Sequence, residues 1–313
     1  MASKQKKTGS PTPKAPAQRA PRRASARDWI SGARLRTLPL GIAPVALGSA
    51  AAHIDGREVW HEYRIVLCFI LAIAIQIAVN YANDYSDGVR GTDKHRVGPS
   101  RLTGSGAAKP RTVLTVALVF FAIAALAGLA LVVLSHQWWL LIVGAACIAA
   151  AWFYTGGKRP YGYAGLGEIF VFVFFGIVAT AGSTYVQVGR VNVESWISAV
   201  AIGLIACAVL MVNNLRDRVQ DAAAGKRTLS VRVGDRASRV LFVVFLGLPY
   251  VALAFFTLFY SNAGYVYFTL LAAVPAMLIV LTGKTPKEFI LALQLTSLTA
   301  LLFGLGLAWA IAF

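Results

Sequence analysis

Two stretches rich in asparagine and aspartate hold the side chains of this 313-residue chain that are best suited to chemistry. The first runs from Asn80 to Asp93 and the second from Asn213 to Asp221, and together they hold five of the thirteen acidic residues. Residues three or four positions apart share a helix face, so each stretch predicts a stripe of carboxylates next to asparagine amides. A pattern that occurs twice indicates one kind of site built from two helices.

Carboxylates inside a membrane helix need a positively charged partner, and the sequence offers two kinds. Neighbouring arginines such as Arg90, Arg216 and Arg218 could form ion pairs without any function. The duplicated pattern favours a metal ion instead. Oxygen ligands without histidine or cysteine suit Mg²⁺, Mn²⁺ or Ca²⁺, and Mg²⁺ typically joins one or two carboxylates to substrate phosphate oxygens. We therefore predict Mg²⁺ and a phosphate-bearing substrate.

The loops after the two motifs supply cations for such a phosphate. Lys94, Arg96 and Arg101 follow the first motif, and Lys226 and Arg227 follow the second. The alternative is that these residues only mark the cytoplasmic side of a membrane protein, where lysine and arginine accumulate anyway. The three cysteines lie in apolar runs, without the spacing of a disulfide framework or a zinc site.

The elements that carry the motifs are predicted to be membrane helices. Only 14% of the residues are charged and 58% are hydrophobic, whereas soluble proteins have about 25% charged residues. A span needs about 20 mostly apolar residues, and nine such runs occur without the alternation of barrel strands. They lie near residues 37–53, 64–83, 112–134, 138–154, 164–186, 195–215, 238–260, 265–281 and 290–312. The predicted fold is an all-α polytopic membrane bundle of nine transmembrane helices.

The distribution of positive charge predicts the orientation of this bundle. With nine spans, the loops on the N-terminal side hold 27 of the 30 lysines and arginines. Because cytoplasmic loops carry the excess of Lys and Arg, we expect a cytoplasmic N-terminus and an outside C-terminus. Both motifs then lie at the cytoplasmic ends of their helices, in a cell membrane.

Residues 1–27 are predicted to form a disordered basic cytoplasmic tail, followed by the transmembrane domain at residues 28–313. The tail holds eight Lys or Arg, four prolines and no acidic residue, and such a segment cannot bury enough apolar surface to fold alone. Its charge favours the anionic lipid surface of the bilayer. Nucleic acid is not an expected partner, because no recognition module follows the tail.

Several stretches of the chain, spread over residues 34–312, resemble the UbiA-type intramembrane prenyltransferases. Within that superfamily the chain is most similar to the branch that prenylates 1,4-dihydroxy-2-naphthoate for menaquinone synthesis. The stretches are Arg36–Pro39 with Pro44, Asn83–Asp87, Gly98–Gly106, Tyr154–Glu168 and Asn214–Leu229. The two aspartate motifs carry the likeness to the superfamily. The stretches Tyr154–Glu168 and Gly225–Leu229 carry the likeness to the naphthoate branch.

The resemblance implies that a polyprenyl chain moves from an allylic polyprenyl diphosphate to 1,4-dihydroxy-2-naphthoate with loss of CO₂, giving demethylmenaquinol. It implies Mg²⁺ as cofactor, held by catalytic carboxylates. The implied catalytic and metal-binding residues are Asp84, Asp87, Asp217 and Asp221. The implied substrate-binding residues are Asn80, Asn83, Asn213, Asn214, Lys94, Arg96, Arg101, Tyr154, Lys158, Arg159, Lys226 and Arg227. Aromatic faces for an allylic cation are expected from Tyr81, Tyr85, Phe153, Tyr154 and Tyr161.

One position departs from the superfamily pattern, and two other functions fit parts of the sequence. The last acid of the first motif would fall at residue 91, where this chain has Gly91, with Asp93 two residues later. Another aromatic acceptor, such as 4-hydroxybenzoate, would use the same motifs. An ion-coupled transporter also carries repeated intramembrane acids, but its site lies near the midplane, whereas both motifs here end at one membrane face.

Overall fold

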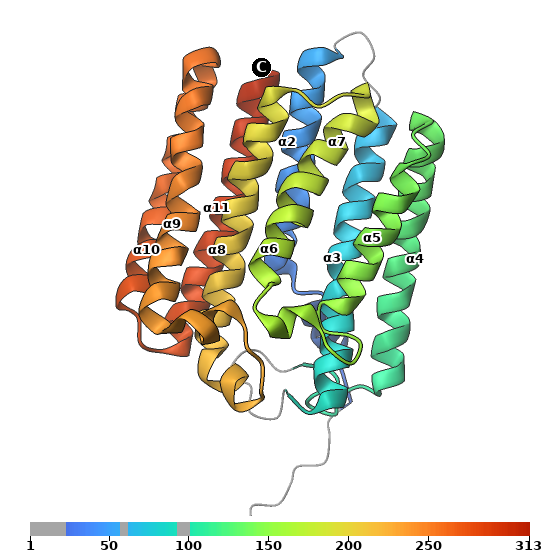
Figure 1. The fold of residues 1–313 in the computed structure, drawn as a ribbon, viewed down its shortest axis with the longest axis vertical. Helices are drawn as coiled ribbons and strands as arrows, with labels where there is room; N and C mark the ends of the chain where they lie inside the picture. Colours follow the sequence, from blue (N-terminus) through green and yellow to red (C-terminus); the bar gives the residue numbers. More distant parts are fainter. Residues whose placement is uncertain (1–22, 57–61, 93–100) are drawn as a thin grey trace, which may run out of the picture.

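The computed structural model of the chain describes residues 23–56, 62–92 and 101–313. Within these residues all regular structure is helical, and the long helices stand side by side as an upright bundle (Figure 1). The all-α prediction is therefore confirmed. Lys94, Arg96 and Asp93, together with most of the predicted tail, lie outside the described residues.

The helices follow one another along the chain, and most of the connections between them are short. The α-helices are α1 (Ala26–Gly32), α2 (Pro39–Asp55), α3 (Glu62–Arg90), α4 (Pro110–Ser135), α5 (Leu140–Phe153), α6 (Gly167–Val171), α7 (Ala179–Val188), α8 (Val193–Ala223), α9 (Leu229–Phe259), α10 (Leu270–Thr282) and α11 (Pro286–Ala312). Three 3₁₀ segments are η1 (Leu35–Thr37), η2 (Tyr161–Ala164) and η4 (Ser261–Thr269), and the π-helical segment η3 (Phe172–Val178) joins α6 to α7.

Each of the nine predicted spans coincides with helix in this structure. Whether each of these helices is long enough to cross a membrane is a separate question. In the described part of the chain, seven helices are long and apolar enough to cross a bilayer. The segment 26–37 followed by α2, bent by 46°, could provide an eighth. Helix α5 has 14 residues, fewer than the about 20 that a span needs. A polytopic helical membrane protein is thus confirmed, and nine spans stay a prediction.

Proline and capping residues explain where several helices begin. Pro39, Pro110 and Pro286 occupy the first turn of α2, α4 and α11, where the missing N–H leaves no hydrogen bond unmade. At α11 the Thr285 hydroxyl accepts from the N–H of Glu288, and the Glu288 carboxylate accepts from the N–H of Thr285. This reciprocal pair satisfies two N–H groups that the helix itself cannot.

Small residues allow the helices around the centre of the bundle to approach closely. A Cβ atom on Gly48 of α2 would lie 2.2 Å from the carbonyl oxygen of Thr180 in α7. A Cβ atom on Gly304 of α11 would lie 2.4 Å from the Cβ atom of Ala43 in α2. Close backbone approach of this kind is a main source of helix association in membranes, where apolar burial against lipid gives little driving force. Helix α2 is thereby held between α7 and α11.

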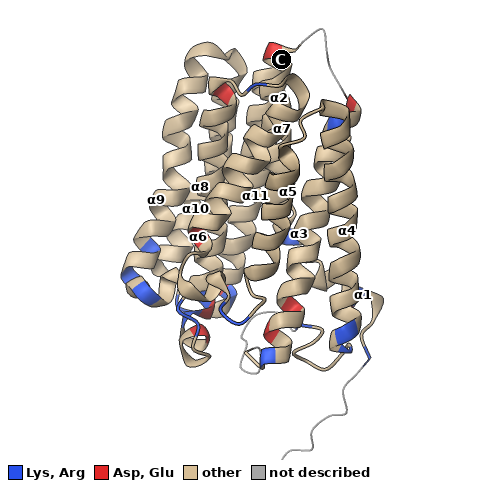
Figure 2. Cartoon of the chain, turned by 45° about the vertical axis from the view of Figure 1, so that its right-hand side comes forward, with Lys and Arg blue, Asp and Glu red and all other residues tan. Residues whose placement is uncertain are grey.

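Charged residues gather at one end of the bundle (Figure 2). Helix α1 lies at this end, and the C-terminus lies at the opposite end. The opposite end has few charges, among them an ion pair between Arg190 and Asp55 at 2.9 Å. Helix α1 begins at Ala26, close to the predicted boundary between the tail and the membrane domain at residue 27, and the N–H of Ala24 donates to the carbonyl of Ala107.

We predict that Gly48→Val destabilises the protein, because the added carbons would force α2 away from α7. Overpacking of this kind costs about 1 to 3 kcal/mol or more. Thermal unfolding of the purified protein in detergent would show a lower midpoint. The matched control is Gly247→Val in α9, where the nearest atom to an added Cβ lies 3.8 Å away. Equal midpoints for the two variants would contradict the packing argument.

Candidate active site

A cavity of about 580 Å³ lies within the bundle and joins both aspartate motifs. Its polar end is lined by residues of α3 and α8, including Asp87, Asp217 and Asp221. Its other end is apolar and is lined by residues such as Leu131 of α4 and Gly182 of α7. A molecule with a charged head and a greasy tail would find a matching environment along the cavity.

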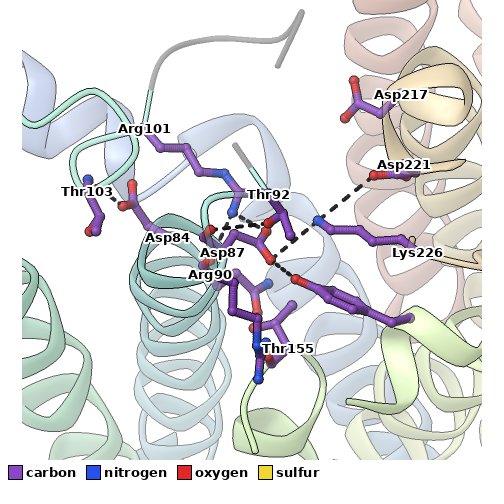
Figure 3. Close-up of polar contacts among 12 residues, drawn as sticks. Asp84, Asp87, Arg90, Thr92, Arg101, Thr103, Thr155, Asp217, Asp221 and Lys226 are labelled. Carbon is purple, nitrogen blue, oxygen red and sulfur yellow. Dashed lines mark hydrogen bonds and ion pairs between the residues drawn. The ribbon is translucent and has the colours of Figure 1, made fainter. Parts of the chain in front are cut away.

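Asp87 has three side-chain partners at the polar end. Arg101 Nη1 and the Tyr163 hydroxyl both donate to it, and Lys226 Nζ lies 3.3 Å from its Oδ1 atom (Figure 3). These three partners come from the loop after α3, from η2 and from the loop after α8. Burial and the adjacent Asp87 charge raise the pKa of Tyr163, which keeps that phenol a hydrogen-bond donor. Asp87 therefore joins three chain segments at one buried charge.

Asp84 has a different role from Asp87, although the two lie one turn apart on α3. Its two carboxylate oxygens accept from the backbone N–H groups of Leu102 and Thr103, both at 2.8 Å. Asp84 is not among the residues that line the cavity. On the same face, a Cβ atom on Gly88 would lie 2.4 Å from Thr103, so the loop packs directly on the helix. Asp84 thus anchors the segment that carries Arg101.

The asparagines of the first motif connect α3 to neighbouring segments. The Asn83 Oδ1 atom accepts from the Thr155 hydroxyl at 2.6 Å, and the Asn83 carbonyl accepts from Arg101 at 2.9 Å. Asn80 Nδ2 donates to the carbonyl of Ala33 at 2.9 Å. Both asparagines also line the cavity, so they contribute polar groups to its wall while holding its surroundings in place.

The second motif is organised around Arg216, a buried arginine of α8. Its guanidinium donates to both oxygens of Asp217, at 2.8 Å and 2.6 Å, and to the Asn213 side chain at 2.9 Å. The side-chain amide of Asn214, the residue after Asn213, donates to the Glu168 carboxylate at 3.0 Å. A two-point contact of this kind fixes the plane of the carboxylate as well as its charge. The arginine pairing considered from the sequence is therefore present at Asp217.

Lys226 bridges the two motifs. Its Nζ atom lies 3.3 Å from Asp87 and 3.9 Å from Asp221, and 4.6 Å from the centre of the Tyr163 ring. Figure 3 shows it between the two helices, with contacts to a carboxylate on each side. Gly225, with a φ of +75°, turns the chain at the end of α8 so that Lys226 points back into the bundle. One cation thus compensates carboxylates from both halves.

The structure divides the predicted site residues into two groups. Ten of them line the cavity, namely Asn80, Asn83, Asp87, Arg101, Tyr154, Asn213, Asn214, Asp217, Asp221 and Lys226. Asp84, Lys158, Arg159 and Arg227 are not among the lining residues, and the last three are exposed. Arg90 donates to the carbonyls of Thr155 and Gly157 and so holds the loop that carries Lys158 and Arg159.

Aromatic side chains line the cavity next to the polar end. The Tyr161 ring stacks on Phe170 with centroids 3.9 Å apart and meets Tyr154 edge-on at 5.4 Å. All three line the cavity, whereas the predicted Tyr81 is packed against Trp29 and does not. Phe170 was not expected from the sequence, because an apolar run around it gives no sign of which side faces the cavity.

Three polar residues of the site were also not expected from the sequence. Tyr163 lies in the glycine-rich stretch from Tyr154 to Glu168 that marks the resemblance, and its donation to Asp87 depends on how that stretch folds back. Arg36 and Gln76 both line the cavity. Gln76 could have been singled out from the sequence, because it is a polar residue between apolar residues of a predicted span.

The ligand chemistry of the polar end suits Mg²⁺. The described residues contain no group of three or more His, Cys, Asp or Glu side chains placed to hold a metal. They do contain carboxylates on two helices that face one cavity, and Lys226 already bridges two of them. Mg²⁺ usually takes one or two carboxylates and completes its shell with water and phosphate oxygens. Asp87 offers one such carboxylate on α3, and Asp217 and Asp221 offer two on α8, which fits that pattern.

The bundle and its cavity define a polytopic helical membrane protein with a charged site at one end of an apolar chamber. Residues 42–288 match the UbiA prenyltransferase family. The chain therefore belongs to this family, and the resemblance seen in the sequence is confirmed.

Proteins of known name support the same assignment. The chain is 46% identical to the 1,4-dihydroxy-2-naphthoate octaprenyltransferase of Mycobacterium tuberculosis, over 93% of this chain and 98% of that protein. It is 39% identical to the Escherichia coli protein of the same name, over 78% of this chain and 81% of that one. The fold is similar to a UbiA homolog from Archaeoglobus fulgidus bound to GPP and Mg²⁺, with a TM-score of 0.63 at 14% identity, covering 91% and 99% of the two chains.

We predict that Asp84→Ala loosens the loop after α3. Each lost hydrogen bond to a charged acceptor is worth about 1.5 to 3 kcal/mol, so the amides of Leu102 and Thr103 should exchange with solvent at least about tenfold faster. Hydrogen–deuterium exchange measured by mass spectrometry on the full-length protein would detect this change. Asp55→Ala, at the opposite end of the bundle, should leave the loop unaffected. Unchanged exchange in Asp84→Ala would remove the anchoring role.

Proposed function

We propose that this chain transfers a polyprenyl chain from an allylic polyprenyl diphosphate to 1,4-dihydroxy-2-naphthoate, with loss of CO₂, to give demethylmenaquinol in menaquinone biosynthesis. The observation that carries the proposal is the set of carboxylates from two helices, bridged by Lys226, at the charged end of an apolar cavity. The names of the Mycobacterium tuberculosis and Escherichia coli relatives support this choice of acceptor.

The two ends of the cavity suit the two parts of a polyprenyl diphosphate. The diphosphate would lie at the polar end, where Arg101 and Lys226 supply positive charge. The hydrocarbon tail would extend past apolar residues of α4, α5 and α7. Burial of the tail contributes about 25 cal/mol per Å² of apolar surface removed from water, so the enzyme binds mainly through the part that does not react.

Mg²⁺ is the proposed cofactor, with Asp87, Asp217 and Asp221 as its protein ligands. Bound there, Mg²⁺ supplies positive charge that stabilises the leaving diphosphate. Arg101 and Arg216 orient Asp87 and Asp217, because both arginines donate directly to the carboxylates. The ligand role predicted for Asp84 stays a prediction, and the Asp84 carboxylate accepts from the N–H groups of Leu102 and Thr103 in this structure. The likeness to an Archaeoglobus fulgidus structure that contains Mg²⁺ supports the cofactor.

The proposed reaction exchanges bonds at one allylic carbon and one ring carbon. The allylic C–O bond breaks and its electrons leave with diphosphate, while the ring carbon that bears the carboxylate forms a new C–C bond to the allylic carbon. The bond to the carboxylate then breaks, CO₂ leaves, and the electron pair restores the aromatic ring. The faces of Tyr154, Tyr161 and Phe170 stabilise positive charge on the allylic group and exclude water from it.

The membrane arrangement completes the proposal. Nine spans with a cytoplasmic N-terminus would place the site at the cytoplasmic face of the plasma membrane, where a water-soluble acceptor can reach it. The gathering of Lys and Arg at the end of the bundle that holds the site supports this orientation. The positions of α1 and the C-terminus at opposite ends agree with an odd number of spans.

We predict that membranes containing the protein form demethylmenaquinol from 1,4-dihydroxy-2-naphthoate and a long prenyl diphosphate when Mg²⁺ is present, and that EDTA abolishes the product. Product formation is measured by liquid chromatography with mass spectrometry. Asp217→Asn should lower the rate by at least about a hundredfold, since it removes charge from the leaving-group site. Asp55→Asn should leave the rate unchanged.

Two results would count against this function. Full activity in EDTA would remove Mg²⁺ from the proposal. A panel of acceptors given with the same donor tests the ring, and faster turnover of 4-hydroxybenzoate than of dihydroxynaphthoate would replace the proposed acceptor.

We predict that Gly182→Phe blocks long donors while short donors still react. Gly182 of α7 lines the apolar end of the cavity, and an added Cβ atom there meets no atom within 4 Å. A phenyl ring would fill the path of a long tail, whereas a dimethylallyl group should end before this point. The rates with dimethylallyl and long-chain diphosphates are compared in each variant. Gly264→Phe, at an exposed position with equally open surroundings, is the control. A proportional loss for both donors would contradict the proposed tail path.

A further inference from the structure

Arg36 is a cation in the wall of the cavity that the reaction described above does not use. It lies in η1, just before α2, and lines the cavity together with Asp217 of α8. Within the described residues, its side chain makes no hydrogen bond and no ion pair. A guanidinium at the edge of an apolar chamber needs a compensating anion, because an unbalanced charge away from water is costly.

The nitrogen atoms of Arg36 are accessible to a bound molecule. Arg36 is only partly buried, and none of its nitrogen atoms is among the enclosed polar atoms that lack a partner in the described part of the chain. Gln76 lines the same cavity, but its Oε1 atom is enclosed by protein. Because Arg36 lines the cavity with accessible N–H groups, an anion in the cavity can accept hydrogen bonds from it.

The charges next to Arg36 leave an excess of positive charge at this part of the wall. Arg216 and Asp217 are the charged groups that act on Arg36. Arg216 already donates to both oxygens of Asp217, at 2.8 Å and 2.6 Å, so this acid is engaged by another arginine. Two arginines therefore stand beside one carboxylate. A second anion, brought by a substrate, would balance the charge of Arg36.

We propose that Arg36 binds the carboxylate of the aromatic acceptor and so orients the ring for the reaction. This inference rests on the proposed function. The two substrates bring two anionic groups, the diphosphate of the donor and the carboxylate of the acceptor. The diphosphate is assigned to the end of the cavity at Asp87, where Arg101 and Lys226 supply positive charge. Arg36 is not among the partners of Asp87, which leaves it for the carboxylate.

The position of η1 along the cavity agrees with this assignment. Thr37, the next residue, accepts from Gln76 and Asn80 of α3, and Asn80 lies seven residues before Asp87. Seven residues span about 10 Å along a helix axis at 1.5 Å per residue. The chain at Arg36 is thus offset from Asp87 toward the apolar part of the cavity. The acceptor carboxylate belongs at such a place, because its ring carbon bonds to the allylic carbon rather than to the diphosphate.

The shape of the guanidinium gives this contact a second effect. Two parallel N–H groups of an arginine match the two oxygens of a carboxylate and fix its plane as well as its charge. The ring attached to that carboxylate is then held with one carbon directed at the allylic group, and such positioning lowers the barrier to bond formation. Arg36 therefore selects acceptors that carry an acid group, and a neutral ring of the same shape binds more weakly.

The test compares two ligands on two proteins, the wild type and Arg36→Met. The ligands are 1-hydroxy-2-naphthoate and its neutral amide, 1-hydroxy-2-naphthamide, which differ in charge but hardly in shape. Their dissociation constants are measured by equilibrium dialysis on the purified full-length proteins, with Mg²⁺ and inorganic pyrophosphate present. We expect the wild type to bind the carboxylate at least about tenfold more tightly than the amide. In Arg36→Met this preference should fall to near unity.

Pyrophosphate reports separately on the diphosphate end of the cavity. Its dissociation constant in the presence of Mg²⁺ should be the same in Arg36→Met as in the wild type. If Arg36→Met weakens pyrophosphate binding and leaves the preference for the carboxylate unchanged, Arg36 belongs to the diphosphate site and the inference is overturned.

Controls separate this inference from folding and from the proposed function. Arg190→Met makes the same change at the opposite end of the bundle and should keep the wild-type preference. Arg36→Lys keeps a cation and should retain part of the preference, and unfolding midpoints show whether each variant is folded. A preference that persists in folded Arg36→Met overturns the role of Arg36 while the function stands. Absence of dihydroxynaphthoate turnover in the wild type overturns the proposed function itself.

Discussion

The compensation of buried carboxylate charge is the constraint on which this structure depends. An ionised aspartate at the end of a membrane helix costs several kcal/mol unless cations or donors surround it. Asp87 obtains Arg101, Tyr163 and Lys226 from three separate segments, so the loops after α3 and α8 and the η2 turn must all converge on it. The same convergence forms the polar end of the cavity and leaves its apolar part to the helices.

The helices and the two motifs could be predicted from sequence because both depend on local properties. Long apolar runs form helices in lipid, because no water is present there to bind the backbone groups. Residues three or four apart share a face in any helix. The different contacts of Asp84 and Asp87 could not be predicted, since spacing does not show that Leu102 and Thr103 return to donate to Asp84. The number of spans is also hard to derive from hydropathy, because α5 is short and the entry to α2 is bent.

The basic residues also show that a sequence pattern does not identify which side chains enter the site. Lys226 and Arg227 are neighbours in the second loop, yet Lys226 points into the site and the Arg227 side chain is exposed. The difference comes from the positive φ of Gly225 and from the bond between the Arg227 N–H and the Tyr163 carbonyl, which together set the direction of the chain. Charge counts place both residues on one side of the membrane, and only the tertiary contacts separate a site residue from a surface one.

Polarity along α3 changes in steps that match the parts of the proposed reaction. Ala72 lies where the cavity wall is apolar, Gln76 and Asn80 add neutral amides, and Asp87 adds a carboxylate. Helix α3 therefore contributes to both the apolar and the polar end of the cavity. The Thr37 hydroxyl accepts from both Gln76 and Asn80, so the turn before α2 is joined to α3 at these two residues. The N-terminal turn thus acts on the site through two amides.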